Sequence, residues 1–178
     1  NIIEHGQALV VTGSSSGLAE GTPLTVTINN VEYTTAVQAD GSWSVGVTAA
    51  QVSAWPAGTV SIAVSGESSA GNPISITHPV TVDLTPAAIT INTIATDDVI
   101  NAAEKGADLT LSGTTTNVEP GQTVTVTFGG KNYTATVASD GSWTATVPAA
   151  DLASLPEGSA SAQASVSNIN GNSASAVH

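Results

Sequence analysis

Four oxygen-bearing side chains lie within eight consecutive residues of this sequence: Asp97, Asp98, Asn101 and Glu104. Carboxylate and amide oxygens are ligands that Ca²⁺ prefers, and Ca²⁺ takes roughly six to eight oxygens, some of them from backbone carbonyls and water. The spacing differs from the Asp-x-Asp-x-Asp-Gly pattern of an EF-hand loop. The segment is therefore a candidate calcium site of another kind.

The same four residues also suit a solvated turn that binds no ion. Asp and Asn side chains accept hydrogen bonds from backbone amides within turns, which explains why these residues are frequent there. The sequence alone leaves both interpretations open. The choice between them depends on the elements that position this loop.

An internal repeat organises those elements. Residues 1–78 align without a gap to residues 101–178, and roughly a third of the positions are identical. Residues 79–100 have no second copy in the sequence. The chain therefore contains two copies of one unit. Identical positions include Asp40-Gly41-Ser42-Trp43 with Asp140-Gly141-Ser142-Trp143, Gly71-Asn72 with Gly171-Asn172, and His78 with His178.

Within each unit, apolar residues alternate with Thr and Ser, which is the pattern of strands that are buried on one face. Gly-Gly, Asn-Asn and Asp-Gly pairs mark tight turns between these strands. Because about seven short strands per unit are typical of an immunoglobulin-like sandwich, we predict an all-β fold with two tandem Ig-like domains. The strands expected in the second unit are 88–94, 108–114, 122–128, 131–137, 142–147, 159–167 and 173–178.

The predicted domain boundary lies in the segment Asp83-Leu84-Thr85-Pro86, where the strand pattern ends and a proline stiffens the connection. The first domain then covers residues 1–84 and the second covers residues 85–178. The first domain lacks a counterpart of residues 85–100, which carry an opening strand in the second. We expect this missing strand to lie upstream in the full protein.

Composition excludes several classes of function. The net charge is −12 and the only Lys or Arg residues are Lys105 and Lys131, too few for the phosphate contacts on which nucleic-acid binding depends. No apolar run approaches the roughly 18 residues of a membrane-spanning helix. We therefore expect neither a nucleic-acid partner nor membrane insertion. The absence of cysteine leaves no disulfide framework, which directs attention to a metal as a source of stability.

No catalytic arrangement is apparent. The sequence has no Gly-x-Ser-x-Gly nucleophile motif, and two narrow sandwiches with short loops offer no cleft in which a pair of carboxylates could hydrolyse a glycoside. We therefore predict that the chain is not an enzyme.

Further calcium ligands are expected near the linkers. If the first strand runs away from the point where the chain enters a domain, the 97–104 loop lies at the end where the chain leaves it, so a linker aspartate such as Asp83 can join the site. Glu4 and Asn1 are the first-domain copies of Glu104 and Asn101. Residues expected to face the junction from the opposite end of the second domain are Asp140, Glu119 and Asn172.

The indoles and imidazoles favour packing over ligand binding. Trp43, Trp55 and Trp143 are predicted to be buried, because they lie in the inward phase of strands or align with an apolar residue. His5 aligns with Lys105 and is expected to be solvated. His78 and its copy, His178, are expected to be packed or to lie on a sheet face.

Four motifs in a fixed order are similar to a known class of repeat. They are Val-Asp-Leu-Thr-Pro at 82–86, Ile-Thr-Ile-Asn-Thr-Ile at 89–94, the segment from Asp97 to Glu104, and the Asp-Gly-Ser-Trp turn. Together they resemble the tandem bacterial Ig-like repeats of giant surface adhesins that are exported by type I secretion, including biofilm-associated proteins. The resemblance covers essentially the whole chain.

This resemblance implies a secreted, cell-surface rod of many such domains, which calcium stiffens at or near domain junctions and which carries a distal binding region. The partners that it implies are neighbouring repeats of the same chain, with a host or biofilm ligand bound elsewhere in the parent protein, and we expect a monomer. The alternative is a carbohydrate-binding or host-receptor module, which would show an exposed aromatic patch or one domain with enlarged loops.

Overall fold

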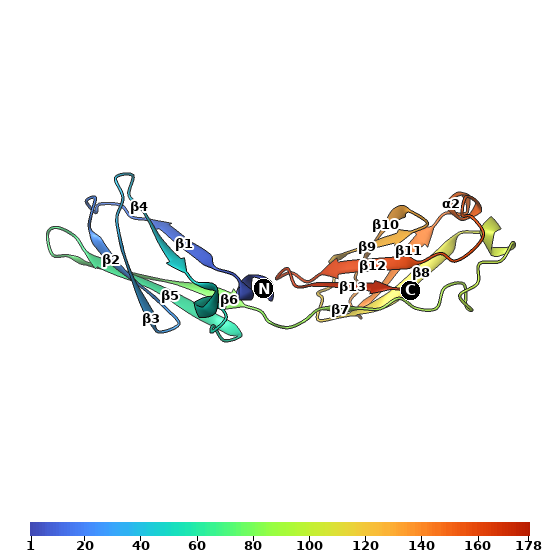
Figure 1. The fold of residues 1–178 in the computed structure, drawn as a ribbon, viewed down its shortest axis with the longest axis horizontal. Helices are drawn as coiled ribbons and strands as arrows, with labels where there is room; N and C mark the ends of the chain where they lie inside the picture. Colours follow the sequence, from blue (N-terminus) through green and yellow to red (C-terminus); the bar gives the residue numbers. More distant parts are fainter. The chain divides into compact units, whose positions relative to one another are not determined.

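The computed structural model describes all 178 residues, and the chain divides into two compact units, Asn1–Leu84 and Thr85–His178. We call them domain 1 and domain 2. Each is built from two β-sheets in which all pairings are antiparallel (Figure 1). The predicted all-β class with tandem sandwiches is therefore confirmed.

Domain 1 has a two-stranded sheet, β1-β4, and a four-stranded sheet in the order β3-β2-β5-β6. A single 3-10 turn precedes β1, and a short helix follows β4. Its elements are η1 (Glu4–Gly6), β1 (Leu9–Ser14), β2 (Pro23–Ile28), β3 (Val31–Ala36), β4 (Ser42–Val47), α1 (Ala49–Val52), β5 (Gly58–Glu67) and β6 (Pro73–Val82).

Domain 2 repeats this arrangement and adds one strand, so that its sheets are β11-β8-β7 and β10-β9-β12-β13. The added strand, β7, pairs with the outer edge of β8. Its elements are β7 (Ala88–Ile89), η2 (Glu104–Gly106), β8 (Leu109–Thr116), β9 (Thr123–Phe128), β10 (Lys131–Thr136), β11 (Ser142–Val147), α2 (Ala149–Ala153), β12 (Ala162–Ser167) and β13 (Ser173–Val177).

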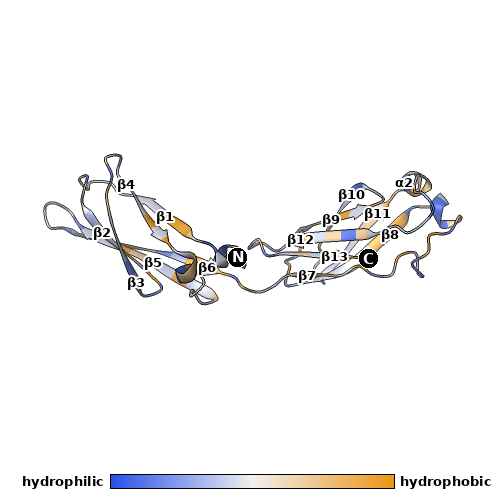
Figure 2. Cartoon of the chain, in the orientation of Figure 1, coloured by the Kyte–Doolittle hydropathy of each residue, from blue (hydrophilic) through white to orange (hydrophobic).

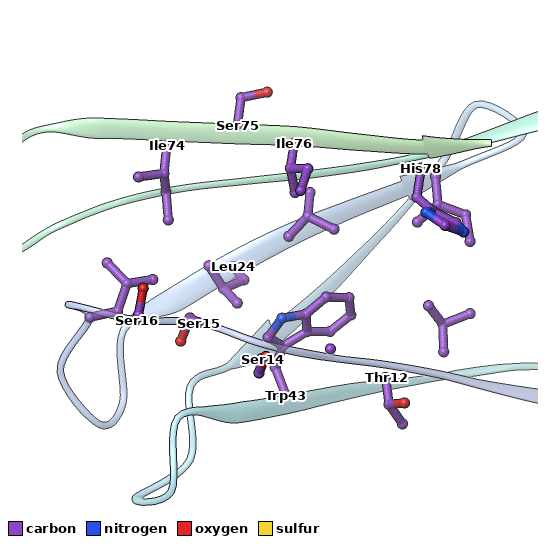
Figure 3. A pocket seen from close by; sticks show the side chains of 15 residues that line it. Thr12, Ser14, Ser15, Ser16, Leu24, Trp43, Ile74, Ser75, Ile76 and His78 are labelled. Carbon is purple, nitrogen blue, oxygen red and sulfur yellow. The ribbon is translucent and has the colours of Figure 1, made fainter.

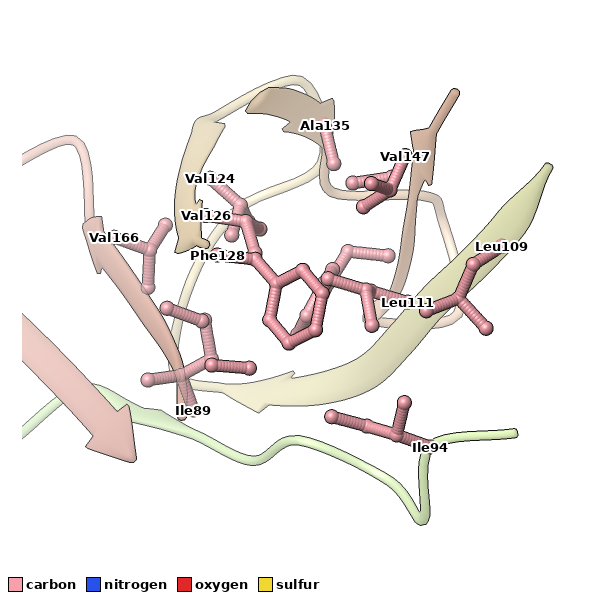
Figure 4. Close-up of a cluster of buried hydrophobic side chains, with 14 of the residues drawn as sticks. Ile89, Ile94, Leu109, Leu111, Val124, Val126, Phe128, Ala135, Val147 and Val166 are labelled. Atoms are coloured by element: carbon pink, nitrogen blue, oxygen red, sulfur yellow. The ribbon is translucent and has the colours of Figure 1, made fainter. Parts of the chain in front are cut away.

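Each domain has its own apolar core between its sheets. In β9 the buried residues Val124, Val126 and Phe128 alternate with Thr side chains, and Figure 4 shows Phe128 in the middle of the domain 2 cluster. In Figure 2, where orange marks apolar and blue marks hydrophilic residues, strands such as β12 carry both kinds of residue along their length. The alternation read from the sequence thus assigns the buried faces correctly.

The opening strand of domain 2 is shorter than the predicted range 88–94. The amides of Thr90 and Asn92 still donate to the carbonyls of Thr114 and Ser112, each at 2.8 Å. The hydrogen bond in the opposite direction, from β8 to this segment, is different. The Thr114 amide donates to the Thr90 hydroxyl at 3.1 Å instead of to a backbone carbonyl. Regular pairing therefore ends at Ile89, although the segment stays extended along β8.

The short helices were not predicted. In α1 the Thr48 hydroxyl accepts from the amide of Gln51, and the Gln51 side chain accepts from the amide of Thr48. Thr-x-x-Gln is the sequence pattern of such a capping box, so this helix start was readable at residues 48–51. In domain 2 a proline replaces the threonine and cannot cap the helix. Instead, Oδ1 of Asp108 accepts from the amide of Ala149, the first residue of α2, at 2.9 Å.

Both lysines are bound in domain 2. The Lys131 ammonium pairs with Asp151, which also accepts a hydrogen bond from the Tyr133 hydroxyl at 2.9 Å. The bond from Lys131 is the main reason that the pKa of Asp151 lies below its usual range, and burial raises the pKa of Tyr133. Lys105 donates to the carbonyl of Leu155 at 3.1 Å.

Candidate functional site

The acidic loop of domain 2 joins β7 to β8 and lies at the Leu109 end of β8. Asp98 ties this loop to the end of the chain: its Oδ1 lies 2.6 Å from Nε2 of His178, which directly follows β13. The same Oδ1 accepts from the amide of Ile94 at 2.8 Å. The sequence predicted His178 as a packed or sheet-face residue, whereas it is paired with this loop.

The backbone bond from Ile94 and, next in weight, the bond from His178 hold the pKa of Asp98 below its usual range. A carboxyl group whose pKa is lowered by folding stabilises the native state above its unfolded pKa, and that contribution is lost as the pH falls through the lower native pKa. The Asp98 contribution is therefore complete at neutral pH, begins to decline near the unfolded pKa of about 4 and is lost as the pH falls through the lower native pKa.

Replacing Asp98 with asparagine should lower the melting temperature of domain 2 at pH 7, because it removes the carboxylate charge that the bonds from the Ile94 amide and His178 stabilise, while an oxygen remains for the Ile94 amide. The difference from the wild type should shrink as the pH falls below about 4. Calorimetry in chelator, repeated across pH, measures it. His78→Ala is the matched control, because the aligned histidine of domain 1 has no ion pair. A pH-independent difference would contradict this assignment.

Asn101 and Glu104 bind each other's backbone. The Asn101 side-chain oxygen accepts from the amides of Ala103 and Glu104, and Oε2 of Glu104 accepts from the amide of Asn101 at 2.9 Å. Domain 1 repeats the arrangement, with Asn1 accepting from the Glu4 amide and Glu4 accepting from the amino group of Asn1. The Asn-x-x-Glu pattern therefore stabilises the 3-10 turns η1 and η2, which precede β1 and β8.

These bonds bear on whether the loop fits a calcium ion. The single side-chain oxygen of Asn101 is already shared by two amides, and Asp97 uses one oxygen to accept from the amide of Val99 at 3.1 Å. No group of three or more His, Asp or Glu side chains is placed so that it could hold a metal ion. By themselves, the acidic side chains of this loop do not assemble an ion site.

Asp140 lies at the opposite end of domain 2. It accepts from the amide and the hydroxyl of Ser142, at 2.9 and 2.6 Å, and the hydroxyl bond is the main reason that its pKa is lowered. The next residue, Gly141, accepts from the amide of Thr115, near the last residue of β8. Asp140 therefore lies far along β8 from the acidic loop, and Asp40 makes the same turn in domain 1.

Two other polar residues lie at the Asp140 end. Glu119 accepts from the amide of Ile169 at 2.9 Å, and the buried Asn172 donates to the carbonyl of Thr85 at 3.2 Å. This is the end at which the linker enters domain 2. In domain 1, Asp83 directly follows β6, whose last residue pairs with Gly58.

The prediction for His5 was wrong. His5 is half-buried, and its Nε2 lies 2.9 Å from the carbonyl oxygen of Trp55. The aligned Lys105 binds the aligned carbonyl, that of Leu155. Both side chains thus tie the 3-10 turn to the segment that follows the short helix. The signal in the sequence was that each copy carries a nitrogen donor at this position.

The tryptophan prediction is confirmed. Trp43, Trp55 and Trp143 have exposed fractions of 8%, 6% and 1%. His78 is exposed on β6, as a sheet-face histidine should be. No helix of the chain has the length and apolar character that crossing a membrane requires.

Two solved structures are similar to this chain along nearly its whole length. One is a Ca²⁺-stabilized adhesin that helps an Antarctic bacterium reach out and bind ice; the identity is 33%, the match covers 99% of this chain and 43% of that chain, and the TM-score is 0.57. The other concerns host cell surface retention of a 1.5-MDa bacterial ice-binding adhesin, with 34% identity, coverage of 99% and 59%, and a TM-score of 0.52. This chain spans only part of either structure. No protein-family model and no curated protein matches it.

Proposed function

Because the chain belongs to the tandem Ig-like repeats of bacterial adhesins, we propose that it is a non-catalytic extender segment of a surface adhesin. Its work is mechanical: two rigid sandwiches in series add length between the cell surface and a distal binding region. Its partners are the neighbouring repeats of the same polypeptide, and its setting is the outside of a bacterial cell, in adhesion or biofilm formation. It acts as a monomer.

The observation that carries this proposal is the equivalence of the two domains. Their shared elements occur in the same order, and the copies align without a gap. Every indole is buried, and none of the exposed large hydrophobic residues is aromatic. A module that binds a sugar or a receptor needs exposed stacking surfaces or divergent loops, neither of which these domains offer, so the extender function is favoured.

Calcium is the second part of the proposal. We propose that the ion binds acidic residues near the linkers and limits the reorientation of consecutive domains. One similar structure is a Ca²⁺-stabilized adhesin. In this chain Asp97, Asp98 and Glu104 each keep one carboxylate oxygen outside the local hydrogen bonds described above. Backbone carbonyls and water are the further donors that Ca²⁺ takes to complete a coordination shell in this loop. Asp83, Glu4 and Asp140 are the acidic residues that the proposal assigns to sites near the linker.

A calorimetric titration tests the calcium part. After chelation, added Ca²⁺ should bind with a defined stoichiometry and raise the free energy of unfolding, by about 2.7 kcal/mol at 100 times its dissociation constant. Small-angle scattering in chelator should show a broader distribution of domain arrangements. Asp97→Asn with Asp98→Asn should reduce the calcium-dependent increment, and Asp40→Asn should leave it unchanged.

The two parts of the proposal fail separately. If the titration releases no heat and Ca²⁺ changes neither the melting temperature nor the scattering curve, the calcium part is rejected and the extender function remains. Glycan or receptor binding by the isolated chain would instead remove the extender function.

A further inference from the structure

Domain 1 contains an apolar groove between the outer edges of β1 and β6. It has a volume of about 360 Å³. Figure 3 shows Ile74, Ile76 and His78 on β6 facing Leu24 and Trp43 across it. Ile74 and Ile76 remain 40% and 68% exposed, which is unusual for two isoleucines that face the interior of a sandwich. The groove therefore leaves apolar surface uncovered.

The same place in domain 2 is filled by an extended segment of the chain. Ile89 and Ile94 are buried there and Ile91 packs against the same core. The segment adds to β8 through the amides of Thr90 and Asn92, and β7 lies beside β13 as well. Covering by this strand leaves Leu111 and Trp143 only 1% exposed. Domain 2 thus shows what kind of occupant the groove of domain 1 accepts.

The edge of β1 offers the same backbone groups as the edge of β8. The carbonyls that accept from the amides of Thr90 and Asn92 in domain 2 belong to Thr114 and Ser112, and their copies are Ser14 and Thr12. Gly113 allows the strand to approach, because a Cβ there would lie 1.9 Å from the oxygen of Thr90. Gly13 keeps the same opening in domain 1. The three atoms nearest to a Cβ built on it all belong to the Trp43 side chain, and none belongs to the backbone.

The two grooves differ in side-chain size at several lining positions on β1, β2, β5 and β6. On β6, domain 1 has Ile74 and Ile76 where domain 2 has Ala174 and Ala176, and the two alanines, like Ile91, pack against the domain 2 core. Interiors tolerate exchanges that conserve total volume and resist additional carbons. Larger side chains on β6 therefore require smaller ones on the strand that covers them.

We propose that the groove of domain 1 is an acceptor for one extended strand of a bacterial Ig-like repeat, added antiparallel to β1, with alanine or valine at the two inward positions that correspond to Ile89 and Ile91. The amides two residues apart on this strand donate to the carbonyls of Ser14 and Thr12. Its backbone passes over Gly13. The 86–94 segment of a second copy is too bulky at both inward positions, so exchange of that strand between copies is disfavoured.

The test extends the full chain with residues 85–100 of its own sequence placed directly before Asn1, because Asn101 follows these residues in domain 2. A second version carries Ile89→Ala and Ile91→Ala within the extension. The alanine version should raise the melting temperature of the domain 1 transition by more than about 5 °C and protect Trp43 from acrylamide quenching. The isoleucine version should raise it less.

Two variants of the acceptor sharpen the test. Ile74→Ala with Ile76→Ala should reverse the preference, so that the isoleucine extension becomes the better one. Gly13→Ala should abolish the gain from either extension, because the added Cβ meets the backbone of the strand. These comparisons test whether larger side chains on β6 require smaller ones on the covering strand, even if one extension folds poorly.

Three results would overturn the proposal. They are no stabilisation by either extension, a larger gain from isoleucine than from alanine in the unmodified groove, and a dimer of the unextended chain in which the 86–94 segment of one copy occupies the groove of the other. Light scattering with size-exclusion chromatography identifies the last result.

Discussion

Replacing Trp143 with alanine is expected to lower the free energy of unfolding of domain 2 by about 3–5 kcal/mol. The indole is 1% exposed and packs in the domain 2 core beneath β7. Its removal deletes a large apolar surface and leaves a sealed cavity that neighbouring side chains fill only in part. Urea denaturation followed by circular dichroism, together with calorimetry, measures the loss.

The chain contains its own control for this change. Trp43→Ala removes the aligned indole, which is 8% exposed and lines the open groove of domain 1. Because the space it leaves joins the groove and is not a closed void, the loss should be smaller than for Trp143. Tryptophan fluorescence in the Trp143 variant reports domain 1 alone, since Trp43 and Trp55 are then the only indoles. Equal losses in both domains would contradict the difference in packing.

The second large effect is expected from Gly113→Ala. A Cβ on Gly113 would lie 1.9 Å from the backbone oxygen of Thr90 and 2.7 Å from the Trp143 ring. Since a backbone atom cannot rotate away as a side chain can, the opening strand must move off β8. We expect a loss of about 3 kcal/mol, at the upper end of the cost of adding a carbon to a packed interior.

Hydrogen exchange locates the damage, because the amides of Thr90 and Asn92 lose their acceptors when the strand moves. Gly13→Ala is the matched change. Its Cβ would meet the Trp43 ring at 2.3 Å, a side chain that has the groove beside it, so a milder loss is expected. Unchanged protection of Thr90 and Asn92 in the Gly113 variant would show that the strand tolerates the methyl group.

The architecture was readable from the sequence because a sheet with one buried face imposes a period of two. Val124, Val126 and Phe128 alternate with threonine in the sequence and are buried in the structure. The end of regular pairing at Ile89 was not readable in this way. It depends on one hydroxyl, that of Thr90, replacing a backbone carbonyl as the acceptor for Thr114.

The candidate site was less predictable, for a physical reason. Composition shows that Asp98, Asn101 and Glu104 carry oxygens, but it does not show which hydrogen bonds those oxygens already make. Asn101 and Glu104 cap a turn, and Asp98 pairs with a histidine 80 residues away in the sequence. The capping by Asn101 is local to its segment, and the turn interpretation of the sequence allowed for it. The pairing with His178 depends on the fold and could not.

The distribution of lysine in this chain also determines how readily trypsin-like proteases cleave it. An enzyme that cleaves after lysine or arginine has two bonds to attack, and domain 1 offers none. Lys105 lies in a 3-10 turn with its ammonium bound to Leu155, and Lys131 begins β10 with its ammonium bound to Asp151. Cleavage requires an extended, accessible segment, so trypsin-like digestion of the native chain must wait for domain 2 to open locally.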